Sequence, residues 1–157
     1  DGLAAKSKST MGWFYGFKLH IVCNQLMQIL AFSITPGNVD DRKGLEIIWE
    51  NLFGLIIADA GYIGKEFQEK AASLNKHMLT GVRANMKKLM TSYQHQLLKL
   101  RQCVESVFSV LKLRFFLEST LSRSPFGYFS HYMWALAAYQ IKQFFKINSR
   151  PKQLDLA

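Results

Sequence analysis

The chain has 157 residues and a formal net charge of +9, with 49% hydrophobic and 20% charged residues. This composition is typical of a folded globular domain and excludes a wholly disordered chain. Its two cysteines, Cys23 and Cys103, are far apart and lie in no cysteine or histidine motif, so they indicate neither a disulfide framework nor a zinc site.

The charge is distributed unevenly along the chain. Residues 1–69 contain 6 basic and 8 acidic residues, whereas residues 70–157 contain 14 basic and 3 acidic residues. A positive field of this kind favours a polyanion such as nucleic acid, or an anionic membrane surface, as partner. The segment 128–145 contains too many polar residues for a spanning helix, and the chain starts with no signal-peptide pattern, so we expect a cytoplasmic protein with no membrane segment.

The first half of the chain predicts a hairpin followed by a helix. Residues 1–11 are small and polar and predict a flexible lead-in, while the period-two pattern of 13–22 predicts a long strand. Residues 29–35 predict a second strand that pairs with it. Pro36 then ends the strand, and Asp40 or Asp41 is expected to cap a helix over residues 45–52.

The second half predicts an α/β arrangement. The apolar run 55–58 is typical of a central parallel strand, followed by a helix over 65–74 and a short strand over 78–82. Apolar residues at steps of three and four predict a long helix from Leu97 to Phe115. A last helix is expected from Ser124 to about Ile147. The order of elements predicts an α/β domain over 12–147 and a tail over 148–157.

Two carboxylates stand out in this arrangement. Asp59 follows the predicted central strand, where open α/β sheets place their active groups, although an aspartate that caps a turn before Gly61 is an equal alternative. Glu105 is predicted to share one side of its helix with Arg101 and Lys112, and a surface ion pair with Arg101 is the simpler reading. Two carboxylates in basic surroundings favour phosphoryl chemistry with Mg²⁺ or Mn²⁺, which prefer oxygen ligands.

Four segments in order resemble the DDE transposases of bacterial insertion sequences, in the RNase H-like superfamily. They are Gly12 to His20, Thr35 to Arg42, Ala58-Asp59-Ala60-Gly61-Tyr62, and Arg101-x-x-x-Glu105 followed by Lys112. The resemblance implies an RNase H-like mixed sheet flanked by helices, which in this chain lacks its first strand.

The resemblance also implies roles for individual residues. Asp59 and Glu105 would be catalytic metal ligands for two Mg²⁺ or Mn²⁺ ions in the complete enzyme. Arg101 and Lys112 would flank the DNA, and Lys18 and His20 would lie near the site and bind DNA as well, with a half-exposed strand pair as the alternative.

The implied activity is DNA transposition. Such an enzyme hydrolyses phosphodiesters at the element ends and joins them to target DNA, so double-stranded DNA and a second copy in a homodimer are the expected partners. The family's first catalytic aspartate matches no residue of this chain, which predicts a fragment that is inactive alone. A basic DNA-binding remnant without catalytic function, and an RNase H-like nuclease, remain the alternatives.

Overall fold

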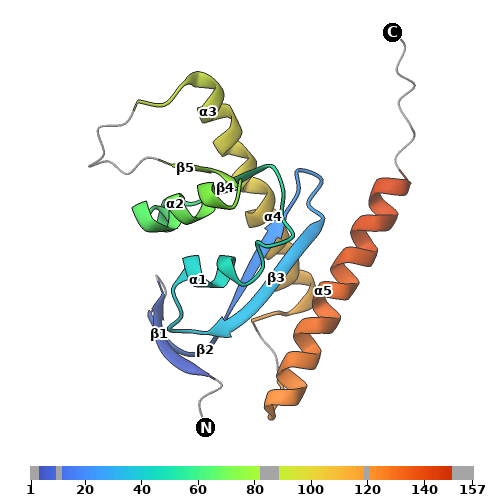
Figure 1. Ribbon diagram of the computed structural model, residues 1–157. Coiled ribbons are helices and arrows are strands. Elements are labelled where there is room, and N and C mark those ends of the chain that lie inside the picture. The colour runs from blue at the N-terminus through green and yellow to red at the C-terminus, as the bar shows by residue number, and fades with distance from the viewer. Residues whose placement is uncertain (1–3, 10–11, 82–88, 119–120, 150–157) are drawn as a thin grey trace. The chain divides into compact units, whose positions relative to one another are not determined.

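The computed structural model describes residues 4–9, 12–81, 89–118 and 121–149 (Figure 1). It divides into two compact units. The first contains Asp1–Cys23 and Ile29–Gln102, and the second contains Asn24–Gln28 and Cys103–Ala157. The strands and helices follow the predicted order, with β1 as an additional first strand, so the predicted α/β class is confirmed, and the arrangement is consistent with an RNase H-like fold.

An antiparallel three-stranded sheet opens the first unit, in the order β1 (Ala5–Ser9), β2 (Gly12–Cys23) and β3 (Ile29–Pro36). Residues 12–16 of β2 pair with β1, and residues 17–23 pair with β3. The expected hairpin is therefore present. The expectation of a flexible lead-in is wrong for residues 5–9, because the exposed N-terminal half of β2 offers them a pairing edge.

Helix α1 (Asp41–Glu46) follows the sheet and is shorter than the sequence pattern predicted. Asp40 caps it by accepting a hydrogen bond from the Arg42 backbone N–H. The Arg42 side chain also donates two hydrogen bonds to this carboxylate, which holds the pKa of Asp40 well below its usual range.

A parallel pair of strands completes the first unit. Strands β4 (Leu55–Ala58) and β5 (His77–Thr80) pair in parallel, and helix α2 (Lys65–Ser73) connects them. Among the described residues β4 pairs with β5 alone, so a parallel strand is confirmed but its central place in the sheet is not.

The core of the first unit lies between α1, α2 and these strands. Trp49 stacks on Phe67 with ring centroids 5.0 Å apart. The buried cluster consists of Leu45, Trp49, Leu52, Ile56, Phe67 and Ala71. Burial of these apolar side chains stabilises the fold of the first unit, and the polar residues of the unit project from this core.

The predicted long helix is present but divided. Helix α3 (Ser92–Leu98) continues through a 3₁₀ turn, η2 (Lys99–Arg101), into α4 (Gln102–Phe115). The last helix, α5 (Pro125–Asn148), begins at the Ser124 cap and lies close to its predicted bounds. The predicted tail, 148–157, falls almost wholly outside the described residues.

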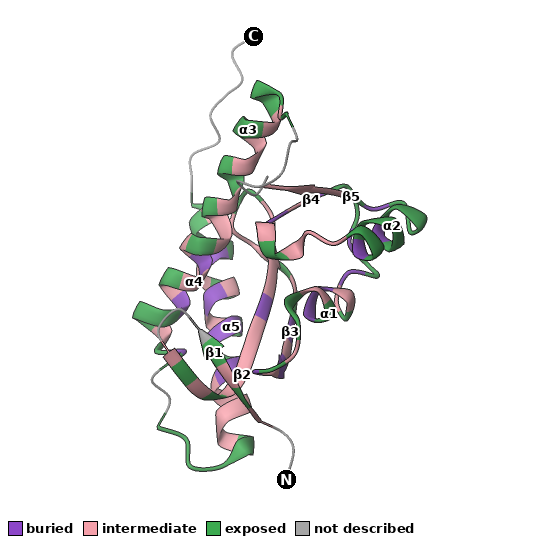
Figure 2. Cartoon of the chain, turned by 90° about the vertical axis from the view of Figure 1, so that its left-hand side faces the viewer, coloured by how far each residue is buried: buried purple, intermediate pink, exposed green. Residues whose placement is uncertain are grey.

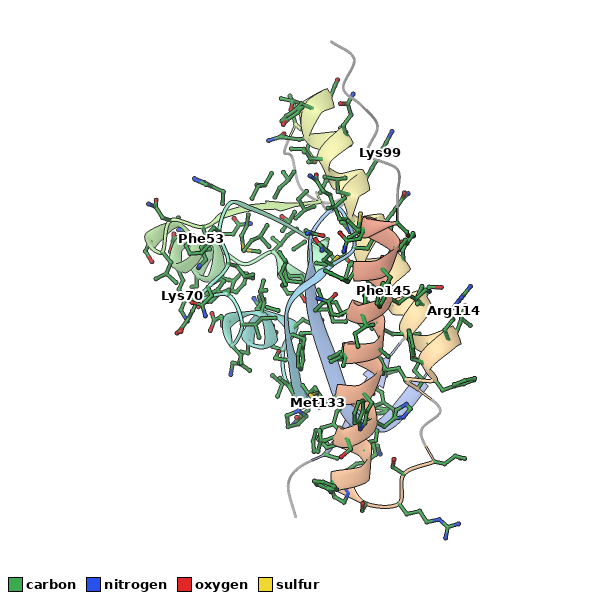
Figure 3. All side chains as sticks on the ribbon, turned by 90° about the vertical axis from the view of Figure 1, so that its right-hand side faces the viewer. Phe53, Lys70, Lys99, Arg114, Met133 and Phe145 are labelled. Atoms are coloured by element: carbon green, nitrogen blue, oxygen red, sulfur yellow. The ribbon has the colours of Figure 1, made fainter. Side chains whose placement is uncertain are left out.

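The buried residues of the second unit lie on α4 and α5. Val107 and Leu111 of α4 and Tyr139 of α5 are fully buried. The Tyr139 hydroxyl donates to the Met27 carbonyl oxygen at 2.8 Å, which ties α5 to the turn Asn24–Gln28. Other α5 side chains, such as Phe145, are exposed (Figure 3). No helix of the described part is both long and apolar enough to span a membrane.

The contact between Gly44 and His20 yields a stability prediction. A Cβ atom at Gly44 would collide with the imidazole ring of His20, which is buried. We expect Gly44→Ala to lower the free energy of unfolding by about 1–3 kcal/mol in urea titrations. Gly16→Ala is the control, because a Cβ there meets only the Phe14 ring at 3.8 Å. Equal effects of the two substitutions would contradict this packing.

Candidate active site

Asp59 directly follows β4 and begins the 3₁₀ turn η1 (Ala60–Tyr62). Its Oδ1 accepts a hydrogen bond from the Ala60 backbone N–H at 2.6 Å. The side chain is nevertheless 64% exposed. Asp59 therefore caps a turn, as the simpler interpretation predicted, and it presents a carboxylate to solvent at the C-terminal end of a parallel strand.

Arg101 supplies the positive charge beside Asp59. A guanidinium nitrogen of Arg101, in η2, lies 3.4 Å from Asp59 Oδ1. Both residues belong to the first unit. Since the two side chains are 34% and 64% exposed, solvent screens the pair, and it adds little to stability. The sequence placed Arg101 near Glu105 and did not predict its contact with Asp59.

Tyr62 lies near both Asp59 and the aspartates at the start of α1. Burial of its phenol raises the pKa of Tyr62 to about 12, and the negative charges of Asp41, Asp59 and Asp40 add to this effect. The phenol therefore stays protonated near neutral pH. Its ring packs against the buried cluster of the first unit. The segments that contain the Asp40-Asp41 pair and Asp59 thus meet around one tyrosine.

Lys18 lies on β2 and faces the start of α1. Its ammonium group donates to the Val39 carbonyl oxygen at 2.9 Å and to Asp41 Oδ1 at 3.1 Å. The side chain is 30% exposed. Lys18 therefore joins the sheet to the N-terminus of α1, and its charge remains close to Asp41.

His20, two residues along the same strand, is buried. Its Nε2 lies 2.8 Å from Thr35 Oγ1 on β3, and its ring covers Gly44. Burial lowers the pKa of His20, and the nearby Lys18 acts in the same direction, while Asp41 opposes it. Because His20 is only 6% exposed, the structure does not favour the direct DNA contact that the resemblance implied for it.

Glu105 and Lys112 belong to the second unit. Both lie on α4, Glu105 in its first turn and Lys112 in its last, and both are exposed. Lys112 forms an ion pair with Glu118 at 2.6 Å. Seven residues separate Glu105 from Lys112, so the two share one side of the helix, as expected from the sequence.

The donor chemistry of these residues suits a hard divalent cation. Asp59 and Glu105 provide carboxylate oxygens, which Mg²⁺ and Mn²⁺ prefer, and Mg²⁺ needs only one or two carboxylates when waters and phosphates complete its shell. Within the described ranges, no three histidine, cysteine or acidic side chains are grouped as a metal site. The two carboxylates thus fit the ion chemically as part of a ligand set.

Two residues with a role in this region were not identified as such from the sequence. Tyr62 was part of a recognised segment but received no function, and Thr35 holds His20. The even spacing of Lys18 and His20 indicated that they share a face of β2. Nothing in the spacing indicated which hydroxyl on the neighbouring strand would meet the imidazole.

Comparison with known proteins gives one match. The model of a family described as "Transposase DDE domain" matches residues 1–125. No curated protein and no solved structure matches the chain. The matched range contains Asp59, Arg101, Glu105 and Lys112.

Burial of His20 predicts a pH dependence of stability. Because its pKa is lowered in the folded state, the unfolded chain binds more protons below the ordinary histidine pKa of about 6.5. The contribution of neutral, buried His20 to the free energy of unfolding is complete above that pH. It is lost as the pH falls toward the lowered pKa of His20 in the folded state. We expect urea midpoints to decrease between pH 7.5 and 5.5, and less so in His20→Gln.

His95→Gln is the matched control, since His95 is exposed on α3. That variant should retain the pH dependence of the parent chain. If His20→Gln and the parent lose stability in parallel over this range, His20 is not the group responsible.

Proposed function

The chain belongs to the transposase DDE-domain family, and on that premise we propose that it acts on DNA in transposition, with Asp59 and Glu105 as catalytic metal ligands. The single observation that carries this assignment is the position of Asp59. It presents an exposed carboxylate at the end of a parallel strand, beside a guanidinium group. Strand ends of this kind are where α/β sheets place their ligands.

In this proposal the substrate is the phosphodiester backbone of double-stranded DNA, at the element ends and in the target. Asp59 and Glu105 would hold Mg²⁺ or Mn²⁺, two ions in the complete enzyme. When bound, such ions activate the attacking oxygen and stabilise the leaving oxygen. Water would break the phosphodiester bond at the element end and leave a 3′-hydroxyl, which would then attack a target phosphodiester and displace the 3′-oxygen of the target strand.

The other residues of the proposed site would either neutralise the charge of the DNA phosphates or hold β2 in position. Arg101 lies against Asp59, so its guanidinium is positioned to neutralise a phosphate that approaches the carboxylate. Lys112 would contact DNA from α4, with Glu118 as its partner when DNA is absent. Lys18 and His20 act as positioning residues, because their hydrogen bonds fix β2 to Val39 and Asp41 and to Thr35, respectively.

The proposed assembly is a homodimer, which would allow two element ends to be processed together. The net charge of +9 supports a polyanionic partner. Cytoplasmic localisation, in contact with bacterial chromosomal DNA, is part of the same proposal.

The experiment compares Asp59→Asn and Glu105→Gln with the parent in Mg²⁺-dependent nicking of DNA that carries the element end. The assay uses the chain alone and the chain extended by the in-frame sequence encoded upstream of Asp1. We expect nicking by the extended form, and a loss of about a hundredfold or more in each variant, since several kcal/mol of charge stabilisation is removed.

Glu69→Gln is the control, because Glu69 is an exposed carboxylate on α2 whose partner is Lys65. It should leave nicking unchanged. Full activity of either site variant would refute the assignment. DNA binding that ignores Mg²⁺ and accompanies no nicking in the extended form would favour the binding remnant, and nicking without strand joining would favour the nuclease.

A further inference from the structure

The N-terminal part of β2 forms a two-stranded ribbon with β1. We call residues 5–9 and 12–16 the β1–β2 ribbon. Strand β3 begins its pairing only at Phe17, so the ribbon extends beyond the part of β2 that pairs with β3 (Figure 2). The register between β1 and β2 alone therefore determines which side chains share each face of the ribbon.

That register places basic and aromatic residues together on one face. Lys6 lies opposite Tyr15, and Lys8 lies opposite Trp13. Because side chains alternate across a strand, all four project from the same face. The other face contains small residues and Phe14, whose ring lies against Gly37.

The basic and aromatic face is open to solvent. Trp13 is 67% exposed and Tyr15 is 73% exposed, and both lysines are exposed as well. The ammonium groups of Lys6 and Lys8 lie 5.0 and 5.8 Å from the centre of the Trp13 ring. These cation–π contacts hold positive charge beside the ring.

Protection of the exposed sheet edge explains the lysines of β1 but not the aromatic rings of β2. Lysines on an edge strand such as β1 prevent pairing with another chain. They do not require two large aromatic rings at successive same-face positions of the neighbouring strand. Exposed rings with adjacent ammonium groups instead match a surface on which bases stack while their phosphates meet lysine.

We propose that the β1–β2 ribbon binds single-stranded DNA through base stacking on Trp13 and Tyr15 and phosphate contacts from Lys6 and Lys8. Single strands are favoured over duplex because duplex bases already stack on one another and offer no free ring faces. This inference relies on the family's DNA substrate but does not involve Asp59, Glu105 or a metal ion.

The test is fluorescence anisotropy with a labelled oligothymidylate of about twelve nucleotides, measured in EDTA. Working in EDTA separates this inference from the catalytic assignment, which requires a divalent ion. We expect Trp13→Ala and Tyr15→Ala each to weaken binding between about fivefold and a hundredfold, and Trp13→Phe to retain most of it. Circular dichroism checks the fold of every variant.

Matched controls are available in the chain. Trp134→Ala on α5 and Tyr93→Ala on α3 remove rings that are 75% and 68% exposed, and both should leave affinity unchanged. In Lys6→Gln/Lys8→Gln, the salt dependence of log K should decrease in slope by about 1.4 for a single strand.

Three outcomes would overturn the proposal. The first is unchanged oligothymidylate affinity in Trp13→Ala and Tyr15→Ala. The second is an equal loss in the control variants. The third is an equal loss of affinity for a duplex of the same length, which would indicate a general phosphate contact without stacking.

Discussion

The alternation of side chains along β2 is the constraint on which the first unit depends. Even-numbered residues of this strand face α1, so Lys18 reaches Asp41 and His20 covers Gly44. At the N-terminal end, odd-numbered residues face solvent with the lysines of β1. A shift of one residue would turn the side chains of β2 to the opposite face, so that the imidazole of His20 would lose its buried position.

Local patterns gave a good account of the fold, since hydrophobic period and capping are local properties. The hairpin, α2, α5 and the Asp40 cap could all be predicted in this way. Strand β1 could not, because its alternating lysines and serines have little strand propensity of their own. It forms through pairing and through the cation–π contacts with Trp13, and these depend on a partner strand.

The candidate site was predictable at the level of residue type and less so at the level of contacts. Asp59 could be found because it follows an apolar strand and precedes a glycine. The pairing of Arg101 with Asp59 could not be found, because a helical projection relates Arg101 only to residues of its own helix, such as Glu105. In the structure Arg101 lies in a 3₁₀ turn, and a guanidinium nitrogen is 3.4 Å from Asp59 Oδ1.

We propose that Asp59 and Glu105 are each ligands of divalent ions, and a crystal structure with Mn²⁺ and element-end DNA would show whether they bind metal. We expect anomalous density for manganese within about 2.2 Å of a carboxylate oxygen from each of the two residues. Manganese bound by other residues, with both carboxylates left in water, would contradict it.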